Sequence, residues 1–241
     1  MSYSMKCTRT HNSHRILLAT ALVAMFACAA HPGSAYYIDP SQADLNRILA
    51  PPSASDSDEG RADLEAVLAV QRSRTEGEVK SAQADSEESL FRFTDVMETE
   101  FKSENLPFTM TFFSNVYSDY HQAVASAKSY FNRPRPFVAD PDVKPVIKLP
   151  QDASYPSGHA TFAYVNAILL AYMVPEKAAA IFERAAIFAR NRVVAGVHYP
   201  TDVEAGRISG SVIDNVFLDD PRFMADFEKA RAEVRHALGL P

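Results

Sequence analysis

The sequence predicts an all-α protein, a compact single-domain bundle of six to eight helices. Apolar residues recur at intervals of three and four positions in several segments, which is typical of amphipathic helices. No segment of any length alternates apolar and polar residues in the manner of a half-buried strand. The sequence has no internal repeat, and the part after residue 35 is long enough for one domain with a sizeable core.

The first 35 residues have the pattern of an export signal. An initial region free of acidic residues carries three basic ones, Lys6, Arg9 and Arg15. An apolar run over residues 16–30 follows, and Gly33-Ser34-Ala35 resembles a signal-peptidase site before Tyr36. Because the run is shorter than the roughly 20 residues of a membrane-spanning helix, we expect cleavage and a periplasmic or secreted protein without a membrane span. The alternatives are a retained anchor helix and a lipoprotein acylated at Cys28.

The remaining composition excludes several classes of function. Cleavage after Ala35 leaves 206 residues with 21 Lys and Arg against 30 Asp and Glu, a formal net charge of −9. A chain this acidic is a poor candidate for binding nucleic acid through bulk electrostatics. Both cysteines, Cys7 and Cys28, lie within the expected signal. The mature protein is therefore expected to have no disulfide and no thiol for catalysis or for a zinc site.

Residues 36–60 predict an extended lead-in, because the prolines and the acidic run in this segment are typical of a loop. The helical domain is expected over residues 61–241. Its first helix is predicted over residues 61–80 by the helical spacing of apolar side chains. Asp85 followed by Glu88 resembles a capping box, which predicts a second helix running to about residue 102.

The rest of the domain is expected to be helical apart from one long loop. A helix over residues 109–131 ends before Pro134, and five prolines in residues 132–155 predict an irregular loop. Residues 160–174 are strongly apolar but too short to span a membrane, and Asn166 interrupts them, so we expect a buried core helix. Further helices are expected in three segments, residues 175–190, 201–218 and 226–238.

Three clusters carry the candidate chemistry, and the first lies where the helix over residues 109–131 ends. Lys128 precedes Arg135 and Pro136 by about two helical turns. An arginine offers a planar fork for phosphate oxygens and a lysine offers a point charge, so the pair can grip one anion from two sides. Solvated charges at a helix end are the simpler interpretation of this cluster alone.

The second cluster is Tyr155-Pro156-Ser157-Gly158-His159, directly before the apolar helix. A helix N-terminus presents unpaired N–H groups and the positive end of the helix dipole. Gly158 lets an anion approach the backbone closely, Ser157 can donate its hydroxyl, and His159 can deliver a proton. The alternative is an ordinary turn with Ser157 as the N-cap.

The third cluster runs from Asn191 and Arg192 to His198 and Asp202. Gly196 indicates that a helix ends before His198, which leaves the histidine in the connection. Asp202, in the first turn of the next helix, can reach back to one imidazole nitrogen and leave the other free as a nucleophile. Arg192 supplies a further fork for phosphate. The alternative is a capping aspartate beside a surface histidine.

The conjunction of the clusters outweighs these simpler interpretations. After the expected cleavage four histidines remain, His121, His159, His198 and His236. Two of them, His159 and His198, stand in these turn-to-helix segments. Together the clusters resemble the signature of the type 2 phosphatidic acid phosphatase superfamily, which also includes vanadium haloperoxidases. The signature is Lys-x6-Arg-Pro, then Pro-Ser-Gly-His, then Ser-Arg-x5-His-x3-Asp, and every internal spacing is kept. One position departs, because Asn191 stands where the signature has serine.

The exported part resembles the class A nonspecific acid phosphatases of bacteria over about residues 45–235. The sequence Val203-Glu204-Ala205-Gly206-Arg207, after the third cluster, adds to this likeness. The resemblance implies a helical bundle of the acid phosphatase and vanadium haloperoxidase type, acting on small phosphate monoesters. It also implies that the enzyme needs no cofactor and no metal, and that it forms a homo-oligomer.

The implied mechanism passes through a phosphohistidine on His198, oriented by Asp202, with His159 as proton donor and acceptor. The equatorial phosphate oxygens would be bound by Lys128, Arg135, Ser157, Gly158 and Arg192. One alternative is a vanadate-dependent haloperoxidase on the same site. Another is a non-catalytic phosphate-binding envelope protein, which would not need the two histidines and Asp202.

Overall fold

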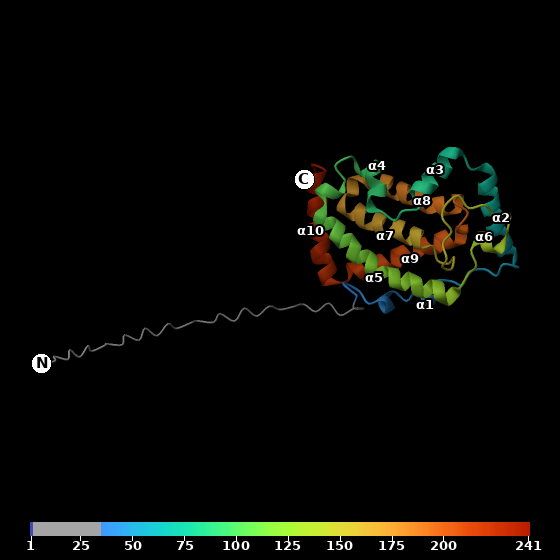
Figure 1. The fold of residues 1–241 in the computed structure, drawn as a ribbon, viewed down its shortest axis with the longest axis horizontal. Helices are drawn as coiled ribbons and strands as arrows, with labels where there is room; N and C mark the ends of the chain where they lie inside the picture. The colour runs from blue at the N-terminus through green and yellow to red at the C-terminus, as the bar shows by residue number, and fades with distance from the viewer. Residues whose placement is uncertain (2–34) are drawn as a thin grey trace. The chain divides into compact units, whose positions relative to one another are not determined.

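Helix α7 (Gly158–Met173) runs through the middle of the domain and packs against α8 (Ala178–Val194) and α9 (Pro200–Leu218) (Figure 1). The structure, a computed structural model, describes Met1 and residues 35–241, so the expected signal lies outside the described residues. The other long helices are α2 (Asp58–Ser73), α3 (Glu76–Ala84), α5 (Pro107–Phe131) and α10 (Pro221–Ala237). Three helices have four residues each, α1 (Leu45–Ile48), α4 (Thr94–Met97) and α6 (Pro136–Ala139). Residues 35–241 contain no strand, which confirms the all-α fold class.

The apolar helix α7 is buried against its neighbours, as the sequence predicts. Leu169, Leu170 and Met173 have no exposed surface, and even Asn166 is almost fully buried. The Asn166 side chain satisfies its amide by donating to the carbonyl of Phe162, one turn earlier. Among residues 35–241, no helix is both long and apolar enough to cross a membrane.

Two glycines bring α9 against α7 at the end of the domain that holds the motifs. A Cβ added at Gly206 would lie 2.6 Å from both Ala160 Cβ and the carbonyl oxygen of Ser157. One added at Gly210 would lie 3.0 Å from Tyr164 Cβ. Because side chains at these positions would force the helices apart, the glycines fix the start of α7 beside the first turns of α9.

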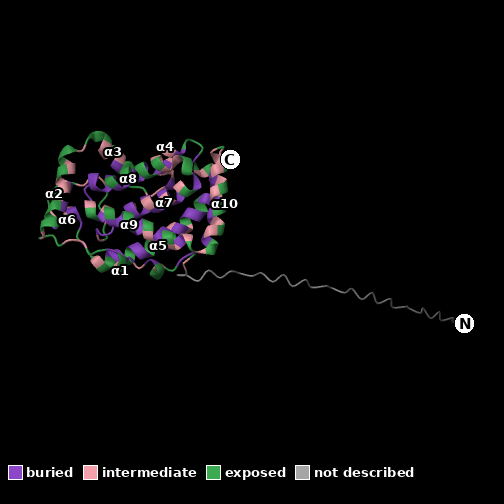
Figure 2. Ribbon diagram, turned by 180° about the vertical axis from the view of Figure 1, so that it is seen from behind, coloured by how far each residue is buried: buried purple, intermediate pink, exposed green. Residues whose placement is uncertain are grey.

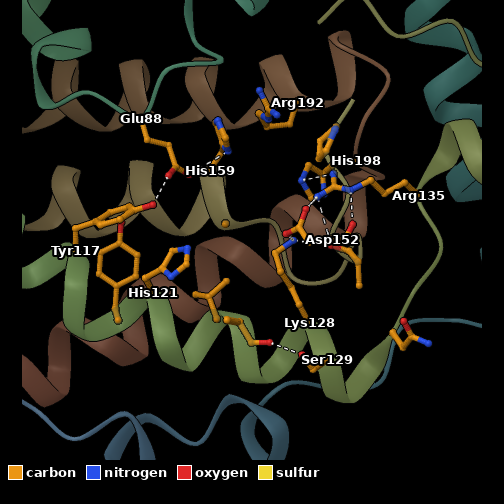
Figure 3. A pocket seen from close by; sticks show the side chains of 17 residues that line it. Glu88, Tyr117, His121, Lys128, Ser129, Arg135, Asp152, His159, Arg192 and His198 are labelled. Carbon is orange, nitrogen blue, oxygen red and sulfur yellow. Dashed lines mark hydrogen bonds and ion pairs between the residues drawn. The ribbon is translucent and has the colours of Figure 1, made fainter. Parts of the chain in front are cut away.

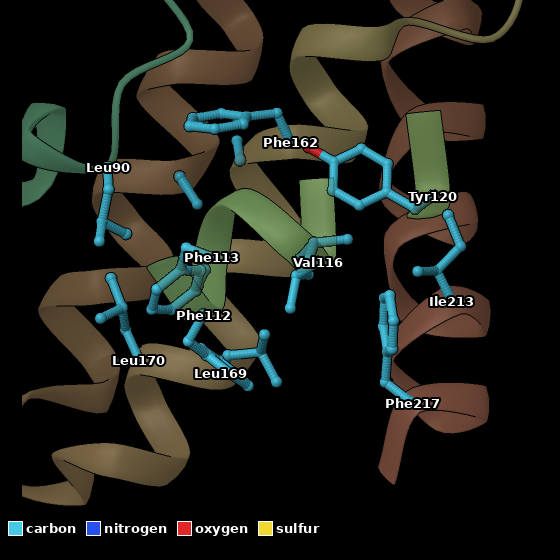
Figure 4. Close-up of a cluster of buried hydrophobic side chains, with 14 of the residues drawn as sticks. Leu90, Phe112, Phe113, Val116, Tyr120, Phe162, Leu169, Leu170, Ile213 and Phe217 are labelled. Carbon is cyan, nitrogen blue, oxygen red and sulfur yellow. The ribbon is translucent and has the colours of Figure 1, made fainter. Parts of the chain in front are cut away.

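The main hydrophobic core includes side chains of α7 and α9 and joins this helix pair to α5. Figure 4 shows Phe112 and Phe113 of α5 and Phe217 of α9 converging with Leu169 and Leu170 of α7. Full burial of each such side chain contributes about 1.5–3 kcal/mol. Buried residues lie on the inner faces of the helices and exposed residues on the outer faces (Figure 2). The motif segments are thus carried by a well-packed scaffold.

The segment before α2 joins this core, whereas an extended lead-in is expected from the sequence. It forms a helical turn, η1 (Pro40–Ala43), before α1. The carboxylate of Asp119 on α5 accepts hydrogen bonds from the backbone N–H groups of Tyr36 and Tyr37, each at 2.6 Å, and of Ile38 at 3.2 Å. Tyr37 and Ile38 are buried, so the segment is anchored to the domain by both hydrogen bonds and packing.

The helix predicted over residues 61–80 is in fact two helices. Thr75 interrupts it and caps α3, because its hydroxyl accepts from the N–H of Glu78 at 3.2 Å. The Glu78 carboxylate accepts in return from the N–H of Thr75 at 2.9 Å. This capping box lies ten residues before the one expected at Asp85, and it lets the chain turn between α2 and α3.

The helix predicted from Asp85 to about residue 102 is wrong. Asp85 instead ends α3, and its fully buried carboxylate accepts from the guanidinium of Arg184 at 2.6 and 3.0 Å. The ion pair ties α3 to α8, so Asp85 is not available as an N-cap. The segment over residues 86–89 is therefore non-helical, and it carries Glu88 to the motif residues.

Candidate active site

The three motif segments meet at one cavity of about 580 Å³ (Figure 3). The cavity lies between α5, the N-terminus of α7, the end of α8 and the loop around residues 150–153. Six of the eight predicted site residues line it: Lys128, Arg135, Gly158, His159, Arg192 and His198. The other two, Ser157 and Asp202, are fully buried and adjoin these lining residues.

Asp202 holds His198 from the side away from the cavity. Its Oδ2 atom lies 3.2 Å from Nδ1 of His198 and accepts from the N–H of Tyr199 at 3.0 Å. The same oxygen accepts from the hydroxyl of Ser154 at 2.5 Å, and Oδ1 accepts from the guanidinium of Arg133 at 2.6 Å. A buried carboxylate needs such compensation, and the four donors make Asp202 a fixed orienting group.

The contacts of His198 define its tautomer. Nη1 of Arg135 lies 3.1 Å from Nε2 of His198, and because a guanidinium only donates, Nε2 accepts. Nδ1 therefore carries the hydrogen and donates to Asp202. Burial, followed by the positive charges of Arg135, Lys128 and Arg192, holds the pKa of His198 well below its ordinary value. His198 is thus a neutral imidazole with its Nε2 lone pair on the cationic side.

Asp152 links two of the cations. Its carboxylate lies 3.0 Å from Nζ of Lys128 and 2.7 Å from Nη2 of Arg135. Partial burial raises the pKa of this carboxyl, but the two positive charges outweigh burial and lower its pKa to about 2. The side chain is 54% exposed, so an anion that arrives from solvent encounters this carboxylate at the two cations.

Arg192 is a buried cation in the wall of the cavity. Its side chain is almost fully buried, and neither Nε nor Nη1 has a hydrogen-bond partner among the described residues. Burial, with the nearby charge of Arg135, lowers the pKa of Arg192 to about 10, so it stays protonated. Buried polar groups are nearly always paired, and a guanidinium forms its strongest hydrogen bonds with an anion.

His159 lies on the cavity wall opposite His198, where it contacts the segment that precedes η2 (Leu90–Phe93). Nδ1 lies 3.0 Å from Oε1 of Glu88, and Nε2 lies 3.1 Å from the carbonyl oxygen of Ser86. Both neighbours accept hydrogen bonds, so both contacts are satisfied together when each ring nitrogen carries a hydrogen. The ring also stacks on Phe188 of α8, with centroids 6.1 Å apart.

Comparisons with known proteins agree with this geometry. Residues 108–222 match the PAP2 superfamily. The chain is 30% identical over 197 residues to the non-specific acid phosphatase of Salmonella typhi, a match that covers 77% of this chain and 78% of that protein. The chain belongs to the PAP2 superfamily. Within the superfamily it is a class A acid phosphatase.

Two further similarities bear on the family and the fold. The chain is 39% identical over 120 residues to the acid phosphatase of Zymomonas mobilis, which is 47% of this chain and about half, 45%, of that relative. The fold is similar to that of a bacterial vanadium-dependent iodoperoxidase, with a TM-score of 0.54 and 19% identity. This structural match covers 74% of this chain and 58% of that protein. It confirms the acid phosphatase and vanadium haloperoxidase type of bundle.

Ser157 serves the start of α7 in this phosphatase. Its side-chain oxygen accepts from the N–H of Ala160 at 3.2 Å, which makes it the N-cap. Its own N–H donates to the carbonyl of Asp202 at 3.0 Å and so joins the starts of α7 and α9. Gly158, the first residue of the helix, forms the cavity wall at this point.

Asn191, the position that departs from the family signature, points away from the cavity. Its amide donates to the Asp85 carboxylate at 2.8 Å and to the hydroxyl of Ser81 at 3.0 Å. In the acid phosphatase this side chain therefore fastens α8 to α3. An asparagine fits this role because it can donate two hydrogen bonds at once, which a hydroxyl cannot.

Four polar residues contact the predicted ones but are absent from the sequence prediction. They are Glu88, Arg133, Asp152 and Ser154. Arg133 lies within the first cluster, two residues before Arg135, and Asp152 and Ser154 precede the second, so their positions gave a local signal. Glu88 lies 40 residues before Lys128, and nothing in its own segment links it to the site. Among residues 35–241, no group of three or more His, Cys, Asp or Glu side chains is arranged to hold a metal ion.

Proposed function

We propose that this acid phosphatase is exported and hydrolyses phosphate monoesters of broad range through a phosphohistidine on His198, without a metal ion. The observation that carries the proposal is that one cavity holds the neutral histidine His198 and a buried arginine, Arg192, whose Nε and Nη1 atoms lack partners in residues 35–241. A phosphoryl group supplies the anion that Arg192 lacks and the electrophile that Nε2 of His198 can attack.

The first half of the reaction transfers the phosphoryl group to the protein. Nε2 of His198 attacks phosphorus in line with the ester oxygen, the P–O bond breaks, and His159 protonates the departing alcohol. Three positive side chains and the N-terminus of α7 stabilise the equatorial oxygens: Lys128, Arg135 and Arg192, with Ser157 and Gly158. These charges take the part that divalent ions have in other phosphoryl-transfer enzymes.

The second half releases phosphate. Water attacks phosphorus on the phosphohistidine, its proton passes to His159, and the N–P bond to His198 breaks. The Asp202 contact stabilises the imidazole in the required orientation in both halves, because Nδ1 keeps its hydrogen throughout.

Acid pH suits this division between the two histidines. An ordinary imidazole is mostly protonated below about pH 6.5, but the lowered pKa of His198 keeps it neutral and nucleophilic there. His159 lies between two hydrogen-bond acceptors, the Glu88 carboxylate and the carbonyl of Ser86. The substrate also gains a proton in this range, since a phosphate monoester has its second pKa near about 6.

The shape of the cavity supports a broad range of alcohols. The cations occupy one end, and Tyr117, Tyr120, His121 and Val124 of α5 line the other. A cavity of about 580 Å³ holds more than a phosphoryl group, which leaves room for leaving alcohols of different sizes.

A panel of phosphate monoesters assayed from about pH 4 to pH 8, with and without a chelator, tests the proposal. We expect hydrolysis of several unrelated esters at acid pH, no effect of the chelator, and no turnover by the His198→Ala variant. Activity that is lost in chelator and restored by a divalent ion contradicts the metal-free mechanism. Turnover by His198→Ala contradicts the nucleophile.

A further inference from the structure

Glu88 is the one carboxylate within 4 Å of His159 in the part of the chain that the structure describes. Its Oε1 atom lies 3.0 Å from Nδ1 of His159, and its Oε2 atom accepts from the hydroxyl of Tyr117 at 3.0 Å. The carboxylate is thus held at both oxygens, on one side by α7 and on the other by α5. Figure 3 shows His159, Glu88 and Tyr117 along the cavity wall opposite His198.

We propose that Glu88, braced by Tyr117, is a positioning residue that makes Nε2 of His159 the atom that gives and takes the proton. The inference rests on the proposed function, in which His159 is the general acid and base. A carboxylate at Nδ1 stabilises a hydrogen there in both states of the ring, imidazolium and neutral imidazole. Nε2 is then the nitrogen whose hydrogen can be exchanged with substrate and water.

The proton balance follows from these contacts. Before the reaction Nε2–H of His159 donates to the carbonyl oxygen of Ser86. When substrate binds, the ester oxygen takes the place of that acceptor. The Nε2 proton passes to the alcohol as the P–O bond breaks, which leaves His159 neutral with its hydrogen on Nδ1 and Glu88. In the second half the attacking water returns a proton to Nε2 as the N–P bond on His198 breaks, so no proton is gained or lost.

Glu88 supplies a negative charge beside His159, where other side chains that line the cavity are positive. Arg192 of α8 and Lys128 of α5 line the same cavity as His159, and both side chains are positively charged. Glu88 is the counter-charge on this wall. Although burial raises the pKa of Glu88, hydrogen bonds from His159 and Tyr117 and the charge of Arg192 lower it overall, so the group is ionised under mildly acid conditions.

The neighbouring residue offers a matched control. Glu87 is exposed and forms no ion pair among the described residues, so Glu87→Gln removes one negative charge from the same segment without touching His159. Glu88→Gln removes the charge at Nδ1, and its amide can present an N–H there, which favours the wrong tautomer.

Steady-state kinetics with a series of phosphate esters test the proposal. For Glu88→Gln we expect kcat/KM on alkyl phosphates to fall about tenfold or more, which is part of the 10²–10⁴-fold that a general acid contributes in full. On nitrophenyl phosphate, whose leaving group needs little protonation, the fall should be about threefold or less. Inhibition by inorganic phosphate should change by about twofold or less, as for Glu87→Gln, because Glu88 does not contact the phosphate-binding cations.

A double-mutant cycle separates positioning from a structural role. If Glu88 acts through His159, adding Glu88→Gln to a His159→Asn variant should lower kcat/KM on alkyl phosphates no further. Equal losses on good and poor leaving groups, or an additive loss in the double variant, overturn the proposal. Failure of the proposed function is seen separately, as turnover by His198→Ala. If Glu88→Gln does not fold, Tyr117→Phe must show the same leaving-group trend with a smaller amplitude, and its absence also overturns the proposal.

Discussion

The carboxylate of Asp202 lies 3.2 Å from Nδ1 of His198, four residues earlier in the chain, and both side chains are almost fully buried. The pair spans the junction where the loop after α8 becomes α9. Arg133, from the other side of the site, neutralises the second oxygen of the same carboxylate at 2.6 Å. The orientation of the proposed nucleophile just before α9 therefore depends on a carboxylate whose charge is balanced by a residue that follows α5.

Asp202→Asn should lower kcat by about 10³-fold or more, because an amide at Nδ1 no longer selects the tautomer with a free Nε2. The variant also leaves Arg133 with one buried charge partner fewer. Asp63→Asn is the matched control, since Asp63 accepts from Arg133 at 2.7 Å and does not contact His198. Comparable loss of stability in both variants, with a large loss of kcat in Asp202→Asn alone, is expected. Equal kcat in the two variants argues against orientation by Asp202.

The two histidines should respond differently to substitution. His198→Ala should abolish turnover of every ester, because no phosphohistidine forms without the nucleophile. His159→Ala should lose about 10²–10⁴-fold on alkyl phosphates and much less on nitrophenyl phosphate. Rapid quench into strong base, in which the N–P bond of a phosphohistidine is stable, should trap the label from labelled substrate on His198 in the His159→Ala variant, since water activation is impaired. Label on residue 159 of a His198→Asn variant would mean that the roles are reversed.

Asp152→Asn should tighten the binding of inorganic phosphate by about three- to tenfold. The carboxylate of Asp152 contacts both Lys128 and Arg135, so a bound anion must compete with it or lie beside a like charge. Competitive inhibition by phosphate at constant ionic strength measures the effect. Asp142→Asn, a substitution on an exposed position of the same loop region, is the control and should leave inhibition unchanged. Weaker inhibition in Asp152→Asn would mean that the carboxylate mainly orients the two cations.

Asp214 of α9 should make the protein less stable as pH rises. Neither carboxylate oxygen has a hydrogen-bond partner among the described residues, and burial raises the pKa of Asp214 well above its ordinary value of 3.8. The folded protein then binds one proton more than the unfolded chain from about pH 4 up to the raised pKa. Over that window this group lowers the free energy of unfolding by about 1.4 kcal/mol per pH unit. Asp214→Asn should remove this slope, and urea unfolding at pH 5, 6 and 7 measures it. An identical slope in the variant would show that Asp214 does not take up this proton.

N-terminal sequencing of the exported protein should begin within a few residues of Tyr36. The expectation follows from the basic region, the short apolar run and the small residues before Tyr36. Because Asp119 binds the N–H groups of Tyr36 and Tyr37, a chain that begins at this position would be anchored to the domain from its first residues. A mature chain that begins at Met1, or one acylated at Cys28, would contradict the prediction.

Local sequence patterns determined most of the helices and the identity of the motif residues. A continuous apolar run located α7, and Pro134 indicated the end of α5, because both signals lie within the segment itself. The same information failed near Asp85, where a plausible capping pattern competes with a long-range ion pair to Arg184. Capping signals describe only the neighbouring four residues, whereas burial of a charge is decided by whatever element packs against it.

The tertiary structure alone decided how the motif residues are supported. Sequence spacing within the third cluster indicated that Asp202 reaches His198, because both lie on one turn of chain. It could not indicate that Arg133 neutralises Asp202, that Asp152 bridges the cations, or that Glu88 faces His159, since these partners are 69, 17 to 24 and 71 residues apart. Such contacts arise from the close packing of α7 and α9 at Gly206 and from the path of the loops around them. Short sequence motifs thus identify the candidate reactive residues. Their charge states and orientation are set by other side chains, which only the folded structure brings into contact with them.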